Sequence, residues 1–136
     1  MAKIDAAKTW TLNYRLLMAV ITEVGAELES LGLDSSKSLF LLAEVDAHPY
    51  PAELAALLLM PRPTVTVAIK RLEADGFLKR QIDASDLRRH RLQLTPAGRK
   101  VTQRGLALLS KAFAARLARL SAAEQATLHS LLERMI

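Results

Sequence analysis

The fold is decided by residues 51–98, which read PAELAALLLMPRPTVTVAIKRLEADGFLKRQIDASDLRRHRLQLTPAG. Two apolar patterns of helical spacing come first, and Pro61 separates them. The first of these helices is expected to bury Leu54, Leu57 and Leu58 and to end at Pro61. Gly76 then provides a natural helix stop, and residues 77–82 and 89–94 read as two strands joined by a polar turn. The order predicts a mainly helical protein with a small β-wing.

The second helix, from about Arg62 or Pro63 to Asp75, has one apolar and one polar face. Its apolar stripe is predicted to consist of Val65, Ala68, Ile69 and Leu72. Small donors at the amino end of a helix, with cations along its flanks, suit base edges and phosphates in a DNA groove, and an outward valine suits a thymine methyl group. We predict that the DNA contacts of this helix are Arg62, Thr64, Thr66, Val67, Lys70 and Arg71. The alternative is a solvent-exposed amphipathic helix.

The turn between the two strands carries two aspartates, Asp83 and Asp86, followed by Arg88 and Arg89. Arg88 is the residue predicted to reach the minor groove, where a narrow floor of acceptors attracts a guanidinium group. Arg89 is a second predicted DNA contact, with a solvated strand position as its alternative. Asp86 would repel phosphate, so we interpret it as a brace that fixes an arginine side chain through a charge-assisted hydrogen bond. A plain turn former is the alternative for Asp86.

Composition agrees with a polyanionic partner. The chain has 136 residues, 51% of them hydrophobic and 24% charged, and a formal net charge of +5. One packed domain of this size is ordinary, and a basic domain favours nucleic acid, although a solvated basic surface gives the same count. The sequence contains no cysteine, which fits a reducing cytoplasm and excludes thiolate metal sites and thiol redox sensing. We expect a cytoplasmic protein, with no secretory signal and no membrane partner.

Apolar stripes flank this central region at both ends of the chain. An N-terminal helix over about residues 7–32 and two C-terminal helices over about residues 98–136 carry leucines and aromatic residues at spacings of three and four. Such stripes are too apolar to leave exposed, so we predict a homodimer. Its predicted interface residues are Trp10, Leu17, Ile21, Leu117, Leu128 and Leu132. The alternative is that both stripes pack within a monomer.

The segment from Arg71 to Gly98 resembles the wing of the MarR family of winged-helix regulators, and the order of elements resembles that family over almost the whole chain. The matching positions are Asp83, Asp86, Arg88, Leu92, Leu94, Thr95 and Gly98. The sequence departs from the family pattern at Leu87, where an arginine is usual, at Val67, where a polar residue is common, and at Pro61, which replaces a serine or threonine cap. These departures bear on the DNA sequence that is preferred.

The resemblance implies a fold and a function. It implies a single domain over residues 1–136, with a winged helix-turn-helix over about residues 34–97 flanked by the dimerisation helices. It also implies a homodimeric transcriptional regulator, a repressor on double-stranded DNA with a pseudo-palindromic site. Regulators of this kind often release DNA when a small aromatic or anionic molecule binds. By resemblance the residues near such a pocket are Tyr14, Met18 and His48.

Other classes of function have less support. A winged-helix module that binds proteins and no longer reads DNA is the main alternative, because Leu87 and Val67 are apolar at places expected to be polar. An enzyme is not expected, since no nucleophile motif or triad signature is present. No cofactor or metal is expected either, because His48, His90 and His129 are isolated from one another.

Overall fold

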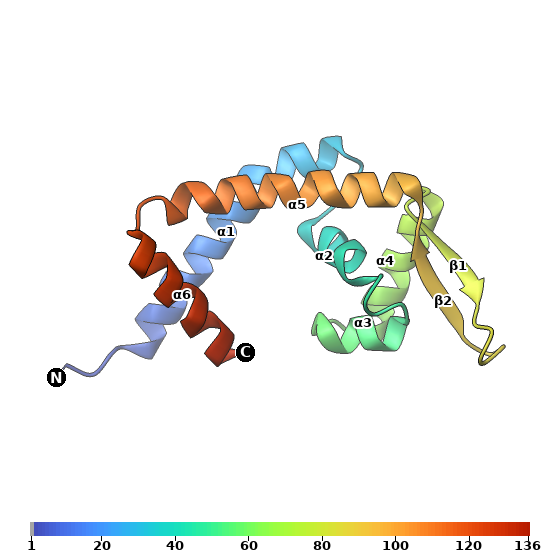
Figure 1. The fold of residues 1–136 in the computed structure, drawn as a ribbon, viewed down its shortest axis with the longest axis horizontal. Coiled ribbons are helices and arrows are strands. Elements are labelled where there is room, and N and C mark those ends of the chain that lie inside the picture. Colours follow the sequence, from blue (N-terminus) through green and yellow to red (C-terminus); the bar gives the residue numbers. More distant parts are fainter. Residues whose placement is uncertain (1) are drawn as a thin grey trace. The chain divides into compact units, whose positions relative to one another are not determined.

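The structure is a computed structural model that describes residues 2–136. Over these residues it contains six α-helices and one antiparallel pair of strands (Figure 1). In chain order they are α1 (Ala6–Ser30), α2 (Ser36–Glu44), α3 (Pro51–Leu57), α4 (Arg62–Ala74), β1 (Leu78–Ile82), β2 (His90–Leu94), α5 (Pro96–Leu117) and α6 (Ala122–Met135). The predicted mainly helical fold with a small β-wing is confirmed.

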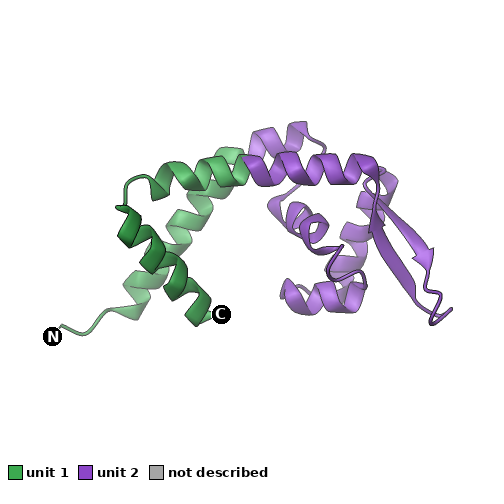
Figure 2. Ribbon diagram, viewed as in Figure 1, with its two compact units in different colours: residues 1–24, 108–136 green, residues 25–107 purple. Residues whose placement is uncertain are grey.

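The chain forms two compact units (Figure 2). One unit combines residues 1–24 with 108–136, and the other comprises residues 25–107. We call them the terminal unit and the central unit. The long helices α1 and α5 contribute residues to both.

The central unit has a continuous apolar core. Helix α2 supplies leucines that are completely buried, and α3 and α4 pack against each other. The inward face of α4 is the predicted one, because Val65, Ile69 and Leu72 are each at most 2% exposed. Other core side chains with less than 2% exposure are Leu39, Leu41, Leu42, Val45, Leu54 and Leu92. This core fixes which side of α4 faces solvent.

Local signals in the sequence set most helix ends. Ser35 caps α2 by accepting a hydrogen bond from the Ser38 backbone N–H, and Thr95 caps α5 by accepting one from Gly98. Ser121 and Glu124 form a reciprocal capping box at the start of α6. Gly76 follows α4 with φ +80°, a left-handed conformation that favours glycine. The predicted helix stop at Gly76 is confirmed.

The end of α3 differs from the prediction. The helix ends at Leu57, well before Pro61, and Leu59 adopts a left-handed conformation with φ 52°. The chain therefore turns sooner than the proline requires, and Leu57 is left 46% exposed. The prediction that Leu57 faces the core is wrong, and Ala55 is buried beside Leu54 in its place.

The terminal unit has a small core and a large apolar surface. Val20 and Ala112 are buried, and Arg116 of α5 forms a 2.7 Å ion pair with Glu23 of α1. Beyond them, Trp10 and Leu17 are 67% and 52% exposed. No single helix among the described residues is long and apolar enough to cross a membrane, although α3 and α4, bent by 118°, pass the same test together.

Candidate nucleic-acid interface

The outer face of α4 presents the predicted contacts to solvent. The helix begins at Arg62 without a side-chain cap, and the Pro61 carbonyl accepts the first backbone bond from Val65, at 3.1 Å. Because the opposite stripe is buried, the outward side chains are exposed along the helix. The exposed set includes all six predicted residues: Arg62, Thr64, Thr66, Val67, Lys70 and Arg71. The helix therefore offers donors, cations and one apolar side chain on a single face.

These residues are not equally free to bind. The Thr66 hydroxyl donates to the Arg62 carbonyl at 2.9 Å, and Arg71 forms a 3.1 Å ion pair with Asp34. Among the described residues Lys70 forms no ion pair. Lys70, like Arg62, is therefore a cation of this face that is available to a phosphate, whereas Arg71 also links α4 to the loop before α2.

The hairpin that follows is anchored at its base. Strands β1 and β2 pair in antiparallel register, with Leu78 opposite Leu94. Leu92 is buried, and its N–H donates to the carbonyl of Pro49 at 2.8 Å. Arg80 of β1 also forms a 2.7 Å ion pair with Glu73 of α4. The base of the wing therefore lies against both α4 and the segment before α3.

The tip of the hairpin carries Arg88 into solvent. Asp86 accepts a hydrogen bond from the Arg88 backbone N–H at 3.0 Å, and its carbonyl accepts the N–H of Arg89. The prediction that Asp86 braces an arginine side chain is corrected here. Its carboxylate forms the turn through the backbone, because a short acidic side chain reaches the N–H two residues on. Asp86 thus orients the backbone of Arg88.

A cluster at the base of the tip joins the wing to the segment before α3. The Tyr50 hydroxyl donates to the carboxylate of buried Asp83, and Ser85 donates to the same carboxylate from its hydroxyl at 2.6 Å and its N–H at 2.9 Å. Arg89 lies over the Tyr50 ring, 3.6 Å from its centroid. Arg89, predicted to contact DNA, therefore also has a stacking partner within the protein.

Hydrogen bonding controls the charge of this cluster. The bonds from the Ser85 hydroxyl, the Tyr50 hydroxyl and the Ser85 N–H hold the pKa of Asp83 well below its usual range. The same bond with Asp83 raises the pKa of Tyr50. Tyr50 stands 33 residues before Asp83, and sequence reasoning missed it as a wing anchor. The one available signal was an aromatic residue between Pro49 and Pro51 beside a predicted hairpin.

The lowered pKa of Asp83 predicts a dependence of stability on pH. A carboxyl group whose pKa is depressed by folding stabilises the protein above its unfolded value, about 3.9, and loses that effect as pH falls below it. We therefore expect the urea midpoint of the protein to fall between about pH 5 and pH 2. Asp83→Asn should lower the midpoint at pH 7 and flatten this acid dependence. Ser85→Ala should be intermediate, and an unchanged acid limb in Asp83→Asn would contradict the role of the cluster.

Comparison with known proteins places the chain beside the MarR family. The sequence profile of the MarR family matches residues 31–89, from the end of α1 to the hairpin tip. The transcriptional regulator SlyA is 28% identical, with 93% of this chain and 90% of that chain aligned and a TM-score of 0.81. A MarR family protein of Mycobacterium tuberculosis in complex with p-aminosalicylic acid is 29% identical over 92% of this chain and 95% of that chain, with a TM-score of 0.73. Residues 31–89 thus match the MarR family, and the chain shares its fold with solved regulators of that family.

Further similarity agrees with this assignment. A probable transcriptional regulator from Pseudomonas aeruginosa is 26% identical over 93% of this chain and 95% of that chain, with a TM-score of 0.75. No curated protein matches the sequence significantly. The chain is a winged helix-turn-helix protein similar to DNA-binding transcription regulators, and β1 and β2 form its wing.

The residues predicted to lie near an effector fall in both units of the chain. Tyr14 and Met18 belong to the terminal unit, where they are 52% and 38% exposed. His48 belongs to the central unit, where its Nδ1 lies 3.9 Å from a carboxylate oxygen of Glu53. Within residues 2–136, no group of three or more histidine, aspartate or glutamate side chains could hold a metal ion.

Proposed function

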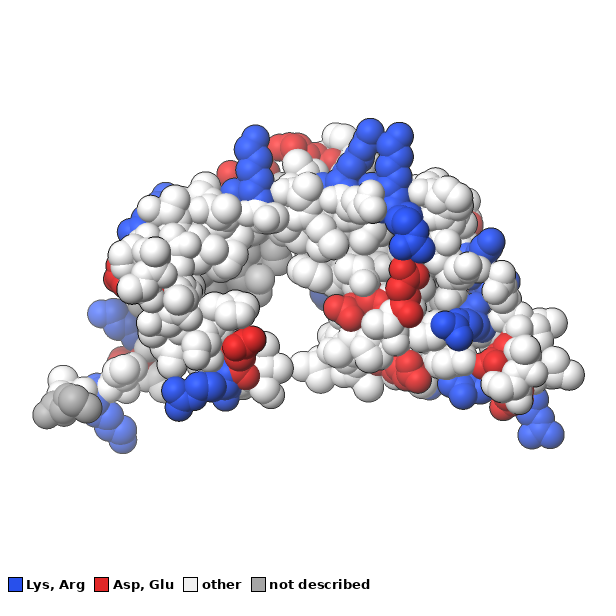
Figure 3. Space-filling model, in the orientation of Figure 1, with Lys and Arg blue, Asp and Glu red and all other residues white. Residues whose placement is uncertain are grey.

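We propose that this chain is a homodimeric repressor that binds an inverted-repeat operator through α4 and the wing. The observation that carries the proposal is the pairing, within the central unit, of an exposed polar face on α4 with a basic hairpin anchored beside it. A helix of this kind fits the major groove, and an arginine at the wing tip fits the adjacent minor groove. Figure 3 shows basic side chains around the hairpin and along α5.

Two further features support the dimer. Predicted interface side chains on α1 and α6 are exposed in the single chain, with Trp10 at 67%, Leu17 at 52% and Leu132 at 42%. An apolar hollow of about 670 Å³ opens between them, lined by Ile4, Ala6, Thr9, Trp10, Asn13, Leu132, Met135 and Ile136. Surfaces of this kind are typical of an interface between subunits. The remaining predicted contacts, Ile21, Leu117 and Leu128, are half-buried.

A small aromatic or anionic effector is a further part of the proposal. The M. tuberculosis relative binds p-aminosalicylic acid, which is both aromatic and anionic. Binding of such a ligand would release this chain from its operator, and the residues predicted for it by resemblance are Tyr14, Met18 and His48. The dimer, the operator and the effector are separate parts of the proposal, and each can fail without the others.

Selection of binding sites from random DNA duplexes tests the proposal. Enrichment of an inverted repeat with half-sites about ten base pairs apart would support both sequence readout and the dimer. If only weak, salt-sensitive binding were found, the alternative of a protein-interaction module would be favoured, because the exposed Val67 and Leu87 would then serve a protein partner. A pull-down that recovered a specific protein would add to that case.

Arg88→Ala is the sharpest variant for the wing. We expect it to weaken binding to the selected duplex by about tenfold, and to reduce the slope of log affinity against log salt by about 1 per protomer. The reason is that Arg88 is exposed at the tip and engages only its backbone with Asp86. Fluorescence anisotropy at several salt concentrations measures both quantities. Asp86→Ala, which retains the guanidinium but loses the turn, should have the smaller effect on the slope.

A further inference from the structure

The tip of the wing presents one large apolar side chain to solvent. Residues 83–89 read DASDLRR, and Leu87 is the only large hydrophobic residue among them. Its side chain is 77% exposed, whereas the other leucines of the hairpin, Leu78, Leu92 and Leu94, are buried. Hydrophobic stabilisation comes from apolar area that is removed from water, so Leu87 contributes little of it to this fold. A partner that covered Leu87 would gain that stabilisation.

Leu87 and Arg88 stand together at the corner of a tight turn. The Asp86 carbonyl accepts the Arg89 N–H at 3.0 Å, which closes a four-residue turn with Leu87 and Arg88 as its central residues. The Asp86 carboxylate accepts the Arg88 N–H, also at 3.0 Å. Figure 1 shows this turn at the end of the hairpin that is remote from α5. An apolar and a cationic side chain therefore lie next to each other where the chain reverses.

The loop that carries this turn is held by hydrogen bonds on both sides. The Asp83 N–H donates to the Arg89 carbonyl at 2.9 Å, and the Asp83 carboxylate accepts the Ser85 N–H at the same distance. The Tyr50 hydroxyl binds that carboxylate from the segment before α3. A side chain can separate stacked bases only if the backbone behind it does not yield. These bonds give Leu87 a backbone of that kind.

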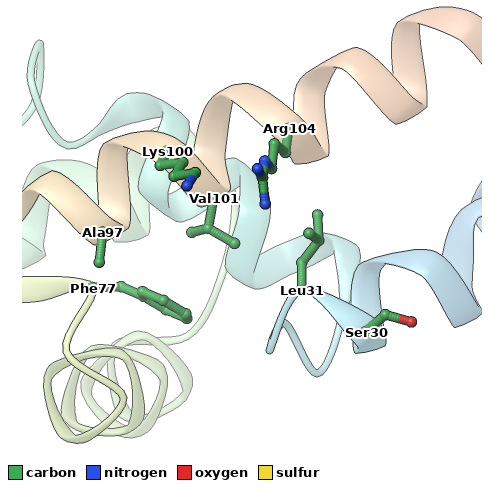
Figure 4. Close-up of a pocket in the computed structure, with 7 residues that line it drawn as sticks. All are labelled: Ser30, Leu31, Phe77, Ala97, Lys100, Val101 and Arg104. Atoms are coloured by element: carbon green, nitrogen blue, oxygen red, sulfur yellow. The ribbon is translucent and has the colours of Figure 1, made fainter.

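The base of the hairpin is also fixed to the helices. The Phe77 N–H donates to the Leu72 carbonyl of α4 at 2.9 Å, and its carbonyl accepts the Thr95 N–H before α5 at 3.1 Å. Figure 4 shows the Phe77 ring beside the first turns of α5, near Ala97 and Val101. Because the wing is joined firmly to α4, both elements can act on one DNA duplex at the same time.

The charges around Leu87 favour DNA over a protein surface. Arg88, Arg89 and Arg91 are exposed on the same hairpin, and among the described residues none of them forms an ion pair. The one exposed acid of the tip, Asp86, already binds a backbone N–H. Three cations around an apolar side chain suit a groove between two phosphate backbones.

We propose that Leu87 is a wedge that enters the minor groove and partly separates two stacked base pairs, so that the wing kinks the DNA. The proposal rests on the proposed function, because it places Leu87 on the same operator. Arg88 beside it binds the acceptors on the floor of the groove. The base step supplies the apolar surface that covers Leu87, and apolar side chains inserted in this way are known to kink a duplex.

A wedge at this position also predicts a sequence preference. Unstacking costs least at flexible pyrimidine–purine steps such as TA and CA, so the bound site should carry such a step where the wing tip lies. We expect the wild type to bind an operator with TA at that step about fivefold or more tightly than one with GC. Leu87→Ala should bind the two operators about equally, because alanine is too short to reach between the bases.

Kinking is tested on a selected operator that carries an energy-transfer pair at its ends. Binding of the wild type should raise the transfer, and 2-aminopurine scanned along each half-site should brighten at the step that loses its stacking. Leu87→Ala should lose both signals and bind about tenfold more weakly. Ile82→Ala is the matched control, because Ile82 is 62% exposed on the same hairpin but lies outside the corner turn. It should keep both signals.

Leu87→Arg separates the wedge from charge. The added cation should increase the slope of log affinity against log salt by about 1 per protomer, while the kink and the preference for TA are lost. Signals that are unchanged in Leu87→Ala, or a wild type that binds its operator without a kink, would overturn the wedge and leave the proposed function standing. A wild type that selects no duplex would count against the proposed function and remove the wedge with it. Unchanged operator affinity in Leu87→Ala, together with loss of a specific protein partner, would assign Leu87 to a protein surface instead.

Discussion

Gly98→Ala is expected to lower the free energy of unfolding by about 3 kcal/mol. A Cβ atom added at Gly98 would stand 2.9 Å from the carbonyl carbon of Phe77 and closer still to its oxygen, so it would collide with backbone. The first turn of α5 cannot easily move away from Phe77, because two hydrogen bonds hold it in place. The Gly98 N–H is held by the Thr95 hydroxyl at 3.0 Å, and its carbonyl accepts the Thr102 hydroxyl at 2.7 Å. Relief of the collision would therefore break the cap or separate α5 from the wing.

Gly25→Ala is the matched control for this prediction. Gly25 lies inside α1, and a Cβ there would meet nothing within 4 Å. Alanine in a helix interior is favoured over glycine by about 0.5–1 kcal/mol, so this variant should be as stable as the wild type or more stable. Urea denaturation followed by far-ultraviolet circular dichroism measures both. A Gly98→Ala protein with wild-type stability would show that the close approach of α5 and Phe77 is not needed.

The contrast between these two glycines illustrates what sequence reasoning could predict. A helix stop or cap depends on residues within one turn, so the Ser121 and Glu124 box and the stop at Gly76 followed from local pattern. The buried stripe of α4 followed from its period, because three- and four-residue spacings place side chains on one face whatever the partner is. Gly98 matched the family pattern, but its steric reason lies 21 residues earlier at Phe77 and required the folded chain.

The cluster of Tyr50, Asp83 and Ser85 that anchors the wing is a second feature that local sequence pattern did not predict. From the sequence, Asp86 is predicted to be the brace at the hairpin tip, and Asp83 is given only as a match to the family pattern. The fold buries Asp83 against Tyr50, whereas Asp86 remains exposed and binds backbone. A hydrogen bond between residues this far apart in the chain produces no periodic pattern in the sequence. The early end of α3 at Leu57 is a further case, because a left-handed conformation at Leu59 contradicts its ordinary preference.

The exposed apolar residues of the terminal unit show how far periodicity alone can predict structure. Periodicity correctly placed Trp10 and Leu17 on one helix, but it does not identify what covers them. In the single chain they face solvent, at 67% and 52% exposure. The same holds for the predicted DNA contacts, because periodicity identifies the outward face of α4 only as the side that does not pack against the core. Periodicity therefore predicts which side chains are free to bind, and the chemistry of each exposed face indicates the kind of partner.

Lys70→Glu is expected to give the largest loss of DNA affinity among single variants of α4. Lys70 is exposed on the helix, one turn from both Thr66 and Val67, and among the described residues it has no acidic partner. Its replacement removes a phosphate contact and adds repulsion at the same point. Affinity for a selected operator should fall by about ten- to a hundredfold, and the salt slope by about 1 per protomer.

Lys3→Glu separates this local effect from net charge. It makes the same change in net charge at a residue outside the helices, so its effect on affinity should be small and should vanish as salt rises. Anisotropy titrations at several salt concentrations compare the two, and sedimentation checks that each protein keeps the same oligomeric state. Equal losses from both variants would mean that DNA senses only the overall charge of the chain. A loss confined to Lys70→Glu, and equal across unrelated sequences, would assign Lys70 to the phosphates and leave base recognition to Thr64, Thr66 and Val67.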